Sequence, residues 1–160
     1  SNVAPEIYYS FRLSAEWKGV GFNALFQGTG NYSAILNTKS VYWPLINNTT
    51  ISQHYYDNRW TENNMNAKYP RLTSQSNENN YQNNSVWVED RSFLKLRTVE
   101  LYYKLPASLL SKTKIMKGAK VYVRGTDLLC FDHIKIADPE SYGATSPLTR
   151  SVLAGLAVEF

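Results

Sequence analysis

Side chains able to carry out acid–base or metal chemistry are few in this sequence and lie far apart. The two histidines, His54 and His133, belong to no HExxH sequence and to no Cys/His ligand set, and no Gly-x-Ser-x-Gly motif occurs. Asp138 and Glu140 could act as an acid pair, but the proline between them favours an ordered turn. We therefore predict a protein that is not an enzyme, with no catalytic residue, no metal site and no cofactor.

One short charged run, Glu89-Asp90-Arg91, could hold a cation. The simpler expectation is a solvated loop with a local ion pair, which contributes little to stability. Lys and Arg are scattered apart from one dense stretch, Lys112 to Lys120, which we expect to form a solvated turn, and the net charge is only +4. Because nucleic-acid binding needs a dense basic surface, we expect no nucleic-acid partner.

Binding chemistry is better represented, because aromatic rings and amides gather in the polar stretch of residues 31–85. Flat rings can stack on sugars or peptide groups while Asn and Gln hydrogen-bond to hydroxyls and amides. The alternative is that the rings pack this stretch against neighbouring loops or a partner protein. The candidate substrate or partner contacts are Trp43, Tyr55, Tyr56, Trp60 and Tyr69.

The elements that flank this stretch are predicted from a period-2 alternation. Residues 7–17 place Tyr9, Phe11, Leu13 and Trp17 on one face and mostly polar side chains on the other. A strand of about 9–11 residues with an aromatic ring at each end is typical of membrane-spanning β-strands. Chain reversal at Lys18-Gly19 predicts a hairpin with a second strand over residues 20–30.

Three further strands are expected, over residues 86–105, 119–129 and 149–160. Within the first of them the apolar parity changes, which predicts a β-bulge near Arg97-Thr98. A short strand is possible around residues 35–43, and a short helical turn is expected over residues 107–117. No run of about 18 apolar residues occurs, so the sequence contains no transmembrane helix.

The connections alternate between short and long, with long loops over residues 31–85 and 131–147. Antiparallel strands that cross a membrane produce this alternation, with the short turns on the periplasmic side. The fold class predicted from this pattern is therefore all-β: an antiparallel meander in a transmembrane β-barrel, with long outer loops. An edge strand of a soluble sandwich is the alternative for the closing segment, which alternates up to Phe160.

Several motifs follow one another along nearly the whole chain. They are Asn-Ala-Lys-Tyr-Pro-Arg-Leu (66–72), the run from Ser85 to Pro106, the run from Val121 to Leu129, Asp138-Pro139-Glu140, and the end of the chain. In this order they resemble the motifs of SusC/RagA-type TonB-dependent outer-membrane transporters. Residues 2–6, before the first predicted strand, also match that family, and Asp127 stands where the family usually has Asn.

This resemblance implies that residues 1–160 are the C-terminal segment, forming the last ~5 strands of a large transmembrane β-barrel. Barrels of this family have about 22 strands and an N-terminal plug. It also implies that the polar strand faces meet the lumen or the plug, and that the terminal strand serves barrel assembly. The lumen-facing candidates are Arg12, Glu16, Lys120 and Arg124, and the assembly signal is Leu156, Val158 and Phe160.

The function implied by the resemblance is TonB-energised import of oligosaccharides or peptides across the outer membrane of a Gram-negative cell. The expected partners are a SusD-like surface lipoprotein, the TonB complex through the plug region, and outer-membrane lipid. Two alternatives stay open: a soluble secreted β-domain that binds glycans through aromatic loops, and a fragment with no function of its own.

Overall fold

The computed structural model describes residues 4–37, 43, 45, 50–75, 77–111, 115–141, 146 and 148–160. The chain forms two compact units. We call residues 8–28, 94–131 and 149–160 the sheet unit, and residues 1–7, 29–93 and 132–148 the loop unit.

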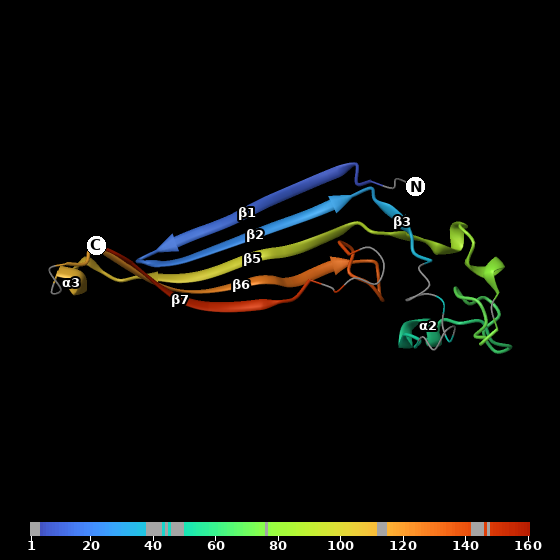
Figure 1. The fold of residues 1–160 in the computed structure, drawn as a ribbon. Coiled ribbons are helices and arrows are strands. Elements are labelled where there is room, and N and C mark those ends of the chain that lie inside the picture. The colour runs from blue at the N-terminus through green and yellow to red at the C-terminus, as the bar shows by residue number, and fades with distance from the viewer. Residues whose placement is uncertain are drawn as a thin grey trace. The chain divides into compact units, whose positions relative to one another are not determined.

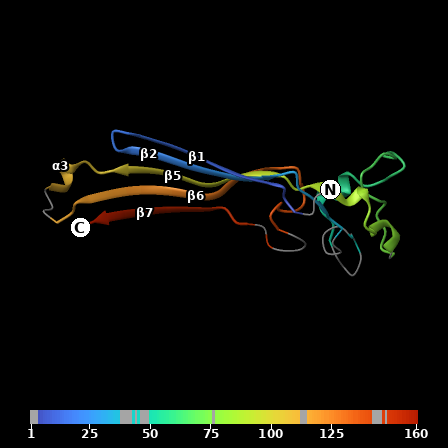
Figure 2. The same cartoon turned by 90° about the horizontal axis from the view of Figure 1, so that it is seen from above.

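A five-stranded antiparallel sheet forms the sheet unit, apart from a few strand ends that belong to the loop unit (Figures 1 and 2). Its strands lie in chain order, which makes the sheet a meander. The pairing of the last two runs from Gly118 opposite Glu159 to Thr126 opposite Ser151. The strands are β1 (Ile7–Trp17), β2 (Val20–Gly30), β5 (Phe93–Lys104), β6 (Gly118–Asp132) and β7 (Ser151–Glu159).

Two residues with positive φ close the β1–β2 hairpin. Lys18 has φ 49° and Gly19 has φ 86°, as a two-residue type I′ turn requires, and this turn matches the twist of the strands. A Cβ at Gly19 would lie 2.9 Å from the backbone oxygen of Lys104, so a side chain has no space there. The hairpin register is thus set by the sequence of the turn.

Two neighbouring strands change phase at their loop-unit ends. Arg97 donates to Gln27, while the next residue, Thr98, lines a hollow on the same face of the sheet. In β6, Thr126 bonds to Ser151 on this face, and Asp127, which has φ 50°, accepts from Arg97. Consecutive residues on one face are the signature of a bulge, which the sequence predicts near Arg97-Thr98.

The expected strand over residues 86–105 is interrupted. Its first part forms a 3₁₀ turn, η3 (Ser85–Trp87), and a short strand, β4 (Val88–Asp90), which pairs antiparallel with β3 (Ser33–Ile35) in a separate sheet. Trp87 is enclosed, and its indole N–H donates to the backbone oxygen of Asn80 at 2.9 Å. The residues from Ser85 to Asp90 therefore lie outside the five-stranded sheet, and the strand that joins it begins at Phe93.

The loop unit has an aromatic core within a stretch that shows no sequence period. Helix α2 (Gln53–Asp57) begins at Ser52, whose hydroxyl accepts from the Tyr55 N–H at 3.1 Å. A second 3₁₀ turn, η2 (Glu78–Tyr81), adds another ring. The buried cluster contains Ala34, Leu36, Trp43, Tyr55, Tyr69, Tyr81, Trp87 and Ile134.

The sheet unit, by contrast, exposes large apolar side chains on one face. The one buried residue of the short helix α3 (Ala107–Leu110), which lies in the connection between β5 and β6, is Leu110. Phe11 and Phe26 stack with ring centroids 4.8 Å apart yet leave Phe11 exposed. Exposed members of this face are Tyr9, Phe11, Leu13, Trp17, Val20, Phe22, Leu101, Tyr103, Val121, Val123, Val152 and Leu156.

Among the described residues, no helix has the length and apolar character needed to cross a membrane.

Candidate functional site

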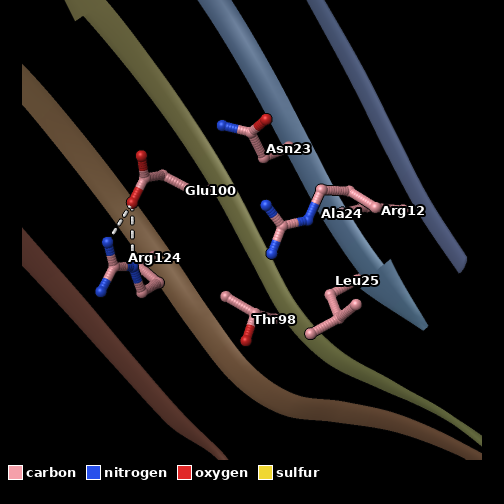
Figure 3. A pocket seen from close by; sticks show the side chains of 7 residues that line it. All are labelled: Arg12, Asn23, Ala24, Leu25, Thr98, Glu100 and Arg124. Carbon is pink, nitrogen blue, oxygen red and sulfur yellow. Dashed lines mark hydrogen bonds and ion pairs between the residues drawn. The ribbon is translucent and has the colours of Figure 1, made fainter. Parts of the chain in front are cut away.

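A shallow hollow of about 300 Å³ lies on the polar face of the sheet unit, opposite the exposed apolar face (Figure 3). Four neighbouring strands, β1, β2, β5 and β6, line it. Because side chains alternate along each strand, the residues of one parity meet here. They are Arg12, Asn23, Leu25, Thr98, Glu100 and Arg124, with Ala24 at the floor.

Glu100 is the centre of the charged groups on this face and is only 6% exposed. Its carboxylate accepts from Arg124 Nε at 2.8 Å and from Lys120 Nζ at 3.1 Å. A carboxylate this far from water is stable only when it is paired and hydrogen-bonded. Arg124 and Lys120 of β6 meet that requirement, and the hydrogen bonds restrict the rotamers of Glu100 and of both cations.

A second charged group lies nearer the β1–β2 turn. Glu16 accepts from the Tyr102 hydroxyl at 2.6 Å and from Lys104 Nζ at 2.8 and 3.0 Å. These residues come from β1 and β5, on either side of β2. Their side chains therefore cross over β2 to meet.

Glycine makes that crossing possible. A Cβ at Gly21 of β2 would lie 2.0 Å from the Tyr102 ring, and one at Gly155 of β7 would lie 2.5 Å from the Tyr122 ring. Each tyrosine thus covers the glycine of an adjacent strand. The ammonium of Lys120 lies 5.0 Å from the centre of the Tyr102 ring and 5.1 Å from that of Tyr122, close enough for cation–π attraction to both.

The four residues expected to face a lumen, Arg12, Glu16, Lys120 and Arg124, therefore share one face, and three of them are ion-paired. Sequence reasoning missed Glu100, the residue that joins two of them. A signal was present: Thr98, Glu100, Tyr102 and Lys104 alternate with apolar residues after the phase change in β5. Assigning the face of every residue in that strand would have found it.

The aromatic candidates of the loop unit divide into two groups. Tyr55 is 1% and Tyr69 3% exposed, and their rings stack 4.5 Å apart. Trp43 is likewise buried, against Tyr81. Because the three rings are covered within this cluster, their faces are not open to a ligand in this structure, and this packing agrees with the alternative interpretation of the aromatic stretch. A contact role for Trp43, Tyr55 and Tyr69 stays a prediction.

Burial changes the acidity of two of these rings. Loss of water raises the pKa of Tyr69 from 10.0 to about 12, with the carboxylate of Glu89 adding to the shift. Burial raises the pKa of Tyr55 further, helped by the hydroxyl of Tyr81 at 3.4 Å. Both phenols are therefore neutral in the folded unit across the physiological range of pH.

Tyr56 and Trp60 remain accessible, at 45% and 37% exposure. The guanidinium carbon of Arg59 lies 3.6 Å from the centre of the Tyr56 ring and covers one of its faces. Of the five aromatic candidates, these two keep surface that a substrate or partner could touch.

The run Glu89-Asp90-Arg91 is not a solvated loop, because Arg91 is buried. Its guanidinium donates to the backbone oxygens of Pro139, at 2.6 and 3.0 Å, and Ser141, at 3.2 Å. Hydrogen bonds from the Ser92 backbone and side chain hold the pKa of Asp90 below its usual value, although partial burial opposes them. No group of three or more possible metal ligands occurs within the described ranges.

The terminal strand β7 is an edge strand of this sheet. Leu156 lies opposite Val121 and is 64% exposed, whereas Val158, opposite Ala119, is half-buried. Phe160 follows the strand and is exposed. Leu156 and Val158 share one parity, so their side chains lie on one face of the strand.

Two TonB-dependent receptors of Formosa agariphila are similar to this chain in sequence. Receptor P26 is 31% identical over 137 residues, and receptor P3 is 28% identical over 137 residues. The matches cover 85% and 86% of this chain but only 13% of each relative. The chain thus spans about an eighth of their length. No protein-family model matches it.

Solved structures of the RagAB peptide importer share the fold. In its 'open-open' state the match has a TM-score of 0.73 at 29% identity, over 99% of this chain and 17% of that chain. In its 'closed-closed' state the TM-score is 0.72 at 28% identity, over 99% of this chain and 18% of that chain. Both matches extend over the sheet and the loops.

Proposed function

This chain is a SusC/RagA-type TonB-dependent receptor segment, and we propose on that premise that its parent protein imports a nutrient across the outer membrane. The observation that carries the proposal is the two-faced sheet. One face exposes a continuous set of aliphatic and aromatic side chains, and the other holds paired charges. A wall between lipid and a polar lumen requires this division.

In this proposal β1, β2, β5, β6 and β7 are the last strands of the barrel. Leu13, Leu101 and Leu156 face lipid, and the polar hollow faces the lumen. The long loops over residues 31–85 and 131–147 are the outer loops of the barrel, and the terminal strand with Leu156, Val158 and Phe160 carries the assembly signal. Support comes from strand length, since each strand has the length that a tilted crossing needs.

The proposed cargo is an oligosaccharide or a peptide. Similarity to a peptide importer supports the peptide, and the accessible rings of Tyr56 and Trp60 suit either ligand. The proposed partners are a SusD-like lipoprotein at the surface and the TonB complex, reached through a plug region of the parent protein. No part of this function calls for catalysis.

Cell fractionation and growth test the proposal together. An antibody against this segment should detect a band several times heavier than 18.3 kDa in the outer membrane. Deleting the gene should abolish growth on at least one glycan or peptide mixture as sole source, and the cloned gene should restore it. A soluble band near 18.3 kDa would contradict import and favour a secreted glycan-binding domain.

A further inference from the structure

Arg12 differs from the other cations of the polar face. Lys104 pairs with Glu16, Arg97 with Asp127, and Lys120 and Arg124 with Glu100. Within the described part of the chain, the side chain of Arg12 makes no hydrogen bond or ion pair. The face therefore carries a guanidinium whose charge is not balanced locally.

Glu100 cannot supply the missing partner. It is buried, and each of its oxygens already accepts from a cation of β6. Moving either cation away to admit Arg12 would leave a positive charge without its hydrogen bonds, which costs more than it gains. Arg12 is exposed on this face, so an anion that pairs with it would come from outside the sheet.

The hollow beside Arg12 has the groups and the size to receive such an anion. In Figure 3 the side chain of Arg12 extends from β1 across β2 toward β5. Asn23 and Thr98 add an amide and a hydroxyl to its lining, and Leu25 adds an apolar wall. A guanidinium pairs with the two oxygens of a carboxylate in a planar, bidentate geometry.

We infer that this hollow binds the carboxylate of an acidic side chain from another part of the parent polypeptide, packed on the polar face. This inference rests on the proposed function, in which that face is interior. The volume of about 300 Å³ and the Leu25 wall suit a side chain with its attached backbone, and exceed what a small free acid fills. Relatives of this chain have ample additional polypeptide to supply it, since the match covers only 13% of their length.

Zero-length cross-linking in the full-length protein tests this pairing. In an Arg12→Lys variant, the new amine occupies the place of the guanidinium, and a carbodiimide joins it to a carboxylate only on contact. We expect mass spectrometry to find Lys–Asp or Lys–Glu links from position 12 to a residue outside these 160. Their yield should exceed by at least tenfold that from a Ser10→Lys variant, which places an amine on the same face of β1 outside the hollow.

The contrary outcomes are distinct. Links to Glu100 alone, links to an added acidic peptide, or a yield equal to the Ser10→Lys control would each overturn the inference. If the Arg12→Lys variant fails to accumulate, the wild-type protein can be tested with phenylglyoxal, which modifies arginine. A paired Arg12 should react with this reagent at least tenfold more slowly in native membranes than after unfolding. Equal rates of reaction would overturn the inference.

The cross-link does not depend on transport. If the protein imports nothing and lies outside the outer membrane, yet the Arg12→Lys variant forms the expected link, the proposed function fails and the pairing stands. If import is intact and no link forms, the pairing alone fails.

Discussion

The sheet unit and the loop unit use the same kinds of aromatic and aliphatic residues in opposite ways. Tyr55, Tyr69 and Trp87 of the loop unit are enclosed by one another, whereas Leu13 and Leu156 of the sheet unit are more than half exposed. The loop unit supplies its own apolar environment. The sheet unit leaves that role to its surroundings, which is the arrangement of a membrane strand.

Truncating the loop-unit core should have the largest effect. Trp87→Ala removes a fully buried ring and its hydrogen bond to Asn80, and should destabilise the loop unit by about 3–5 kcal/mol. Protease sensitivity of residues 50–90 in membrane-embedded parent protein measures this. The matched change in the sheet unit, Phe11→Ala, should leave the loop unit unaffected; equal sensitivity in both variants would show that the units do not differ.

A charge on the apolar face comes next. Leu13→Arg should destabilise the parent barrel by about 2–4 kcal/mol if Leu13 lies near the bilayer midplane, because the guanidinium must leave water. Unfolding by urea from lipid vesicles measures it. Ser14→Arg places the same charge one residue further along, on the polar face, and should destabilise the barrel far less. Equal destabilisation by the two variants would contradict the assignment of the two faces.

Adding a side chain at the glycine beneath Tyr102 should destabilise the protein less than the two changes above. Gly21→Ala places a Cβ 2.0 Å from the Tyr102 ring and should destabilise the sheet by about 1–3 kcal/mol, with loss of the Tyr102–Glu16 hydrogen bond. Gly30→Ala is the control, since its Cβ would meet Ile7 at an ordinary 3.5 Å. Equal urea midpoints for the two variants would contradict the close packing.

The last expected effect is a response of the loop unit to alkali. Because the folded pKa of Tyr69 is raised from 10.0 to about 12, its contribution is complete below pH 10 and is lost as pH rises through 12. The loss should be about 1 kcal/mol per pH unit in that window. Tyrosinate absorbance and protease sensitivity should rise together there, and Tyr69→Phe should weaken the dependence on pH.

The sheet could be predicted because the sequence pattern that specifies each strand lies within that strand. Alternation along residues 7–17 and 20–30 specifies both the strands and their two faces, and Lys18-Gly19 specifies the turn between them. Even the phase change at Arg97-Thr98 shows in the parity of the apolar residues. The same alternation places Arg12 and Arg124 on one face before any contact is known.

The loop-unit core could not be predicted, because its contacts join residues that no short window contains. Tyr55 meets Tyr81 across 26 positions, and Arg91 meets Pro139 across 48. Asn-rich sequence between the rings carries no period from which a face can be assigned. The strand predicted from residue 86 is wrong at Trp87 for the same reason. Val86-Trp87-Val88 has the composition of a strand, but Trp87 packs in the loop-unit core.

The tyrosines that cover Gly21 and Gly155 also bear on how such a sheet diverges. A residue larger than glycine at either position conflicts with the ring from the next strand, unless that ring is replaced by a smaller side chain. Positions 21 and 102, and positions 122 and 155, should therefore covary as two independent pairs. Each pair would report the register of its two strands from sequences alone.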